Sequence, residues 1–194
     1  FVFYISEVAK TYNVFTKEDS RASLDIYSEY EWANTHFIEL SELSTTYFDF
    51  ITWRRDDYRG NTINIENGLR KTVNRSNQDL TRFWFFGGST TWGTGVNDEL
   101  TYPSLFAQST SHHAINFGET GYIARQSLAY LNNHLIRSDI QDLTNVKIVF
   151  YDGVNDILHR CRSEISSLGT GRENQIQNIL YSSGVQKFGF SRTF

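Results

Sequence analysis

The sequence predicts an α/β domain built around a central parallel sheet, and three observations support this class. Three short runs are almost continuously apolar, as expected for strands buried on both faces: Arg82–Phe86, Ala114–Phe117 and Val146–Tyr151. Helix-like stretches separate these runs, and each run ends in a glycine-bearing loop with the sequence GGST, GETG or DGVND. Alternating strands and helices are typical of parallel sheets with right-handed crossovers.

Two amphipathic stretches supply the helices between these strands. Between the second and third runs, apolar residues recur at spacings of three and four, which predicts that they line one face of a helix: Ala124, Leu128, Leu131 and Leu135. Between the first and second runs, residues 101–109 form a shorter helix candidate, and Pro103 is tolerated in its first turn. Because the carboxyl ends of parallel strands share one edge of a sheet, we expect the three glycine-bearing loops to converge there.

Residues 1–78 are predicted to form a mainly helical N-terminal extension that packs on the sheet domain of residues 79–194. Residues 23–44 are helix-like, and Asn61–Ile65 alternates as a short strand does. After Asp156 the sequence offers further helix candidates but no fourth convincing strand. The chain also contains no methionine, so we expect a fragment, a processed chain or an incompletely recorded one, and we expect the α/β domain of residues 79–194 to be partial.

Composition excludes several classes of function. The 194 residues carry a net charge of −4 with both signs interspersed, which argues against a nucleic-acid partner. One cysteine, Cys161, excludes an internal disulfide framework and a multi-cysteine metal site, and no metal or other cofactor is expected. The first nine residues are too short to span a bilayer, where about 20 apolar residues are needed, but they suit the end of an upstream anchor or signal segment.

The stretch FWFFGGSTTWGTG places a serine, Ser89, directly after a strand and two glycines. A phosphate-binding loop needs a lysine and a hydroxyl where Thr94 and Gly95 stand. A dinucleotide-binding loop needs a third glycine that GTGVND lacks, and a nucleophile elbow needs GxSxG rather than GGSTT. All three motifs are therefore excluded, although a simple helix cap remains an alternative role for Ser89.

Three blocks in order, FGGSTTWG, NFGETGY and YDGVND, resemble the first three sequence blocks of the SGNH (GDSL-like) hydrolases. The resemblance covers Arg82 to His159. It implies a flavodoxin-like three-layer sandwich and a serine ester hydrolase or acyltransferase that acts on an O-acyl ester of a carbohydrate or lipid. The stretch YRGNTINIENGLRKT ahead of the serine block resembles a bacterial subgroup tethered to the membrane, which implies an extracytoplasmic, membrane-anchored location.

This resemblance also implies roles for individual residues. Ser89 would be the nucleophile, and the oxyanion would be bound by the backbone N–H groups of Ser89 and Gly121 and the side-chain amide of Asn155. Gly118 is the alternative to Gly121, which we prefer because its distance from Asn116 fits the family pattern better. Gly88 stands where the family usually has an aspartate.

The family's fourth block, an Asp-x-x-His that supplies the base, has no counterpart near the carboxyl end of the chain. Asp156 and His159 show this spacing locally, but they directly follow the asparagine block, so we expect a capping aspartate and a surface histidine instead.

Two other functions stay open: a catalytically silent domain that binds an acylated glycan, and a structural subunit that assembles through its aromatic N-terminal half. An aromatic and basic cluster borders the substrate cleft or simply packs: Trp53, Arg54, Arg55 and Tyr58.

Overall fold

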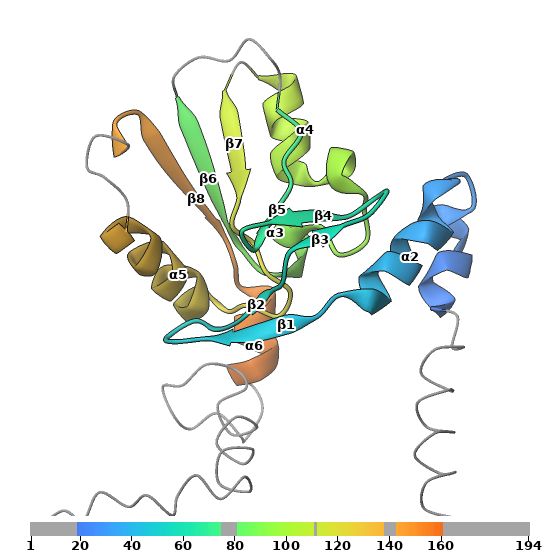
Figure 1. The fold of residues 1–194 in the computed structure, drawn as a ribbon, viewed down its shortest axis with the longest axis horizontal. Coiled ribbons are helices and arrows are strands. Elements are labelled where there is room, and N and C mark those ends of the chain that lie inside the picture. Colours follow the sequence, from blue (N-terminus) through green and yellow to red (C-terminus); the bar gives the residue numbers. More distant parts are fainter. Residues whose placement is uncertain (1–18, 75–80, 111, 138–142, 161–194) are drawn as a thin grey trace, which may run out of the picture.

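The computed structural model describes residues 19–74, 81–110, 112–137 and 143–160, which form an α/β structure (Figure 1). Its helices, where η marks a 3₁₀ helix, are η1 Ser20–Ser23, η2 Asp25–Tyr27, α2 Trp32–Glu42, α3 Ser89–Trp92, η3 Asp98–Leu100, α4 Tyr102–Ser109, α5 Ala124–Arg137 and α6 Val154–Arg160. Its strands are β1 Thr45–Phe48, β2 Thr52–Arg55, β3 Tyr58–Arg59, β4 Asn64–Glu66, β5 Leu69–Arg70, β6 Arg82–Gly87, β7 His113–Asn116 and β8 Val146–Tyr151. The prediction of an α/β fold is thereby confirmed.

The central sheet has the strand order β3-β4-β5-β7-β6-β8 among the described residues. Strand β6 pairs in parallel with β7 on one side and β8 on the other, so that Trp84 lies opposite both Ile115 and Ile148. Helix α4 precedes β7 and helix α5 precedes β8. The three strands expected from their apolar runs therefore exist and are parallel, and the two intervening helices form where the sequence predicts them.

In its described residues, 19–74, the N-terminal extension contains short strands in addition to the helices that the sequence predicts. Strands β3, β4 and β5 form an antiparallel meander, and β5 joins the parallel strands through the pair Arg70 and Asn116. Strands β1 and β2 form a separate two-stranded hairpin. The central sheet is therefore mixed rather than parallel throughout. The proposed boundary after residue 78 falls in 75–80, outside the described residues.

Strand β6 supplies aromatic side chains to both faces of the sheet. Trp84 and Phe86 belong to a buried cluster with Tyr130 of α5, whereas Phe85 packs with Ala107 of α4. Because consecutive side chains of a strand point to opposite faces, the two clusters lie on opposite sides of the sheet. Helices α5 and α4 accordingly cover different faces (Figure 1).

The buried face of α5 matches the leucine spacing only in part: Leu131 is buried and Leu135 packs on the core, whereas Ala124 and Leu128 are exposed. Leu128 is 51% exposed, and the side chains buried on this helix are Gln126, Ser127, Tyr130 and Leu131. Gln126 faces inward because its Nε2 donates hydrogen bonds to the Ile51 carbonyl at 3.1 Å and the Thr52 hydroxyl at 2.7 Å. A polar contact with hairpin β1–β2 thus sets the rotation of the helix.

Strand β8 also departs from its prediction, since it is not buried on both faces. It lies at the edge of the described sheet, where Ile148 is 41% and Phe150 is 45% exposed. The exposed apolar side chains continue into α6 with Val154 and Ile157. An apolar run indicates a strand, but the strand's place in the sheet decides its burial.

None of the helices described is long and apolar enough to cross a membrane.

A buried ion pair fastens the N-terminal meander to the serine-bearing segment. The side chain of Arg70 is completely buried, and its Nε lies 2.6 Å from Oδ1 of Asp98 in η3. Its guanidinium also donates to the Val96 carbonyl at 3.0 Å and lies over the ring of Trp92 in α3. A buried charge is tolerated only when it is paired and hydrogen-bonded, so these contacts are needed together.

We expect Asp98→Asn to lower the free energy of unfolding by about 3 kcal/mol or more, because it leaves the Arg70 charge buried without its counter-ion. The matched control is Asp19→Asn, which removes the partner of the exposed Arg21 and should cost less than about 1 kcal/mol. Urea-induced unfolding measures both. Equal losses in the two variants would contradict the structural role assigned to the Arg70–Asp98 pair.

Candidate active site

Ser89 is the first residue of α3, and only Gly88 separates it from the end of strand β6. The helix is one turn long and ends at Gly93, whose left-handed φ of 88° suits a glycine and whose N–H bonds to the Ser89 carbonyl at 2.9 Å. Within the described part of the chain, the half-buried Ser89 hydroxyl has no hydrogen-bond partner. As the first residue of a helix, Ser89 also has a backbone N–H without an intrahelical acceptor.

The loops that follow β6, β7 and β8 meet beside this serine. Asn155, in the first turn of α6, donates a hydrogen bond from Nδ2 to the Tyr122 carbonyl at 2.8 Å. A β-carbon placed on Gly88 would lie 2.7 Å from the same Nδ2 and 3.2 Å from the Tyr122 carbonyl. The segments Gly88–Ser89 and Gly121–Tyr122 and the side chain of Asn155 therefore lie against one another. The second N–H of the Asn155 amide is left for another acceptor.

Gly121 and Gly118, the two alternatives for a backbone donor, have different surroundings. The Gly118 N–H donates to Asn116 Oδ1 at 2.9 Å, and its α-carbon lies close to the backbone of Trp92. In contrast, the Gly121 N–H has no partner among the described residues, and its φ of 83° is one that favours glycine. Of these two backbone N–H groups, only that of Gly121 is open to a further acceptor among the described residues.

Gly88 has an ordinary φ of −82°, so the reason for a glycine there is steric. Any side chain on residue 88 would enter the space that the Asn155 amide occupies. An aspartate at this position would therefore displace the side chain that links the second and third loops. The Asn155 amide can therefore occupy its position because residue 88, directly before Ser89, has no side chain.

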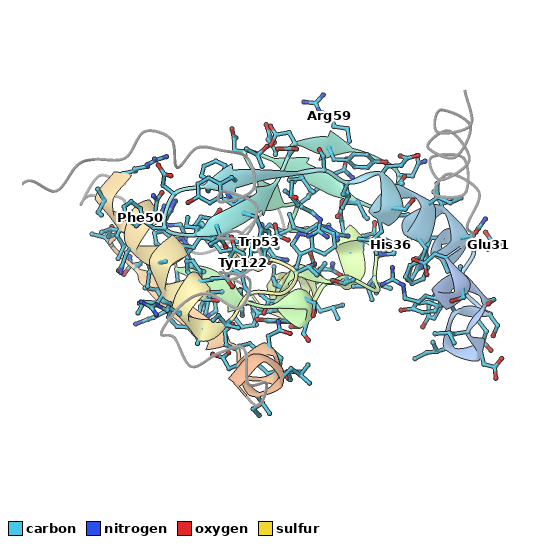
Figure 2. All side chains as sticks on the ribbon, turned by 90° about the horizontal axis from the view of Figure 1, so that it is seen from below. Glu31, His36, Phe50, Trp53, Arg59 and Tyr122 are labelled. Atoms are coloured by element: carbon cyan, nitrogen blue, oxygen red, sulfur yellow. The ribbon has the colours of Figure 1, made fainter. Side chains whose placement is uncertain are left out.

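Hairpin β1–β2 also reaches this site, near the end of the sheet where β6, β7 and β8 finish (Figure 1). Trp53 donates from Nε1 to the Thr120 carbonyl at 3.3 Å, and its ring lies edge-on to Tyr122 with centroids 5.5 Å apart (Figure 2). Arg55 forms an ion pair with Glu119. Two members of the aromatic and basic cluster thus contact the second loop. The sequence did not reveal these partners, because the contact from Trp53 spans 67 positions.

Glu119 lies inside the second loop and is only 2% exposed. Its carboxylate accepts hydrogen bonds from the side chain and backbone N–H of Arg55 and from the Thr120 N–H. Burial raises the pKa of Glu119, and the Arg55 guanidinium opposes this shift. The carboxylate therefore acts as an internal anchor of the loop that carries Gly121.

Asp152 is the first residue after β8 and was not singled out by the sequence patterns. Its Oδ1 accepts a hydrogen bond from the Ser127 hydroxyl at 3.1 Å, while its buried Oδ2 has no partner in the described part of the molecule. Burial raises the pKa of Asp152, and the hydrogen bond from Ser127 opposes this shift. Its position directly after an apolar run is the one signal that would have marked it.

Asp156 serves as a cap, as the sequence indicates. Its carboxylate oxygens accept the backbone N–H of Ala124, the first residue of α5, at 3.1 and 3.3 Å. The side chain of His159 lies outside the described residues. The described residues contain no cluster of three or more histidine, cysteine, aspartate or glutamate side chains placed to hold a metal ion.

No family model matches the chain, and no curated protein matches it. The chemical interpretation of the site rests on its own geometry and on the sequence blocks.

We expect Gly88→Ala to destabilise the fold by about 1–3 kcal/mol, because the new methyl group would overlap the Asn155 amide. In the Asn155→Ala background the same substitution should cost at least about 0.5 kcal/mol less, since its main steric partner is gone. Chemical denaturation of the four proteins in this double-mutant cycle gives the coupling. Additive losses would show that residues 88 and 155 are not in contact.

Asp152→Asn should stabilise the protein at neutral pH. Because the folded state raises the pKa of Asp152 above 3.8, it favours the protonated form, whose stabilising contribution is lost as the pH rises through the folded pKa. The advantage of the Asn variant should therefore be smallest near pH 3 and grow with pH, as measured by unfolding at several pH values. Asp156→Ala, which removes the oxygens that accept the Ala124 N–H at the start of α5, should instead destabilise the protein at pH 7.

Proposed function

We propose that the protein is a serine ester hydrolase or acyltransferase of the SGNH type, with Ser89 as its nucleophile. The observation that carries this proposal is the position of the Asn155 amide, which donates to the Tyr122 carbonyl and fills the space that a side chain on residue 88 would need. This contact brings the serine, the preferred glycine and the asparagine of three separate loops to one end of the sheet. Open α/β sheets bind their ligands at this end, in the crevice formed by the loops that follow the carboxyl ends of the parallel strands.

In the proposed reaction the Ser89 hydroxyl oxygen attacks the acyl carbon while its proton passes to a base. The carbonyl oxygen becomes an oxyanion, which accepts hydrogen bonds from the N–H groups of Ser89 and Gly121 and from the second N–H of the Asn155 amide. The oxyanion then collapses, the ester C–O bond breaks, and the leaving alcohol takes a proton from the base. Water or an acceptor alcohol releases the acyl group from Ser89 by the same steps.

The base of this mechanism is assigned outside the described residues. Among the described histidines, His36 is buried and bonds to Thr62 and to the Thr94 carbonyl, and none bonds to the Ser89 hydroxyl. The substrate class, an O-acyl ester of a carbohydrate or lipid, and the extracytoplasmic, membrane-tethered location follow from the sequence resemblance. They belong to the proposal on that ground alone.

A catalytically silent domain that binds acylated glycans is the second candidate. The specific observation in its favour is the Ser89 hydroxyl itself, which has no basic partner in the described part of the chain. A serine without a base is a poor nucleophile, so the same crevice would then bind an ester without cleaving it.

A fluorophosphonate probe distinguishes these functions. We expect covalent labelling at Ser89 that Ser89→Ala abolishes, while Thr90→Ala, which removes the neighbouring exposed hydroxyl, leaves labelling intact. With a chromogenic acyl ester, Asn155→Ala should lower kcat by roughly 10²–10³-fold, the usual effect of losing one oxyanion donor. Labelling that persists in the Ser89→Ala protein, or none in the natural protein, would refute the esterase proposal.

A further inference from the structure

We infer that Trp53 is a positioning residue that orients the Gly121 N–H toward the oxyanion, and this inference rests on the function proposed above. The residue comes from hairpin β1–β2, far from Ser89 in the sequence. The inference begins from one hydrogen bond, in which the indole Nε1 of Trp53 donates to the Thr120 carbonyl at 3.3 Å (Figure 2).

The Thr120 carbonyl and the Gly121 N–H belong to the same planar peptide group. Because the peptide bond is trans and planar, its C=O and N–H point in opposite directions. A donor that fixes the direction of the carbonyl therefore fixes the direction of the N–H as well. Donation to the carbonyl also polarises the peptide, which strengthens the hydrogen bond that its N–H makes.

The Trp53 ring is itself held in place. A β-carbon on Gly121 would lie 3.5 Å from Cζ2 of the indole, so the ring lies directly against this glycine. The Tyr122 hydroxyl donates to the Trp53 carbonyl at 2.5 Å, and the two rings are in edge contact. The indole thus contacts the residues on both sides of the peptide that it orients.

Arg55, two residues along the same strand, provides a second attachment. Its guanidinium pairs with Glu119, so β2 binds two successive residues of the loop, Glu119 and Thr120. The hairpin is in turn anchored to α5, since Gln126 bonds to the Ile51 carbonyl. Strand β2 and its hairpin therefore connect helix α5 to the loop that carries Gly121.

The loop needs this support at Gly121. Residues 117–123 lie between β7 and α5 outside regular secondary structure, and a glycine permits many backbone conformations. Rotation of the 120–121 peptide would turn the N–H away while leaving the rest of the fold intact. Misplacement of a catalytic group by about 1 Å is enough to cost roughly 10²-fold in rate.

The test is Trp53→Phe, which removes the indole donor and keeps an aromatic ring against Gly121. The matched control is Trp32→Phe, the same chemical change in α2, where Trp32 contacts the rings of Tyr27, Tyr30 and His36. We expect kcat for a chromogenic ester to fall about 10-fold or more in the Trp53 variant, with KM within about twofold. The control should keep the kcat of the natural protein.

A measurement that does not depend on activity is the backbone ¹⁵N order parameter of Gly121. It should be near 0.85 in the natural protein and in Trp32→Phe, and it should fall clearly in Trp53→Phe. An unchanged order parameter and amide shift at Gly121 would overturn the inference whether or not the protein is an esterase. An unchanged kcat in an enzyme that depends on Ser89 would also overturn it. Loosening of Gly121 without any Ser89-dependent activity would support the orienting contact and refute the esterase proposal.

Discussion

The indole of Trp92 joins the parts of the molecule that must stay together for a site to form. It is almost completely buried beside Ile63 and Ile65, and the guanidinium carbons of Arg55 and Arg70 each lie 4.3 Å from its ring centre. Cation–π contacts gain strength when they are desolvated, and each guanidinium also has its own carboxylate partner, Glu119 or Asp98. Because Trp92 ends the helix that begins at Ser89, these contacts locate the serine.

The candidate site is therefore divided between two sources. The parallel strands supply the three loops with Ser89, Gly121 and Asn155, and the N-terminal meander and hairpin hold these loops from outside. This division gives the N-terminal residues a role beyond packing. Charged side chains are buried close to the site because Arg55 and Arg70 tie β2 and β5 to Glu119 and Asp98 through ion pairs.

The sequence predicted the elements whose signal is local. Strands β6 and β7 lie in almost continuously apolar runs and helix α4 follows a capping threonine, and the glycine-bearing loops follow from these elements. Strands β1, β2, β3 and β5 were missed because two to four residues, many of them polar, show no period. The exposure of β8, the inward face of Gln126 and the contact of Trp53 with Thr120 were not predictable for a related reason. Each depends on partners that are distant in the chain.

In the part of the chain that the structure describes, β8 leaves one edge of the central sheet without a neighbouring strand. An edge strand carries a row of backbone donors and acceptors, and natural sheets usually protect such edges with charge, proline or a bulge. Here Lys147 is the one charged residue of the strand, between apolar neighbours that continue through Ile148, Phe150 and Tyr151. Among the described residues no strand pairs with the outer side of β8, so this edge can accept one more extended segment, either from another part of this chain or from a partner.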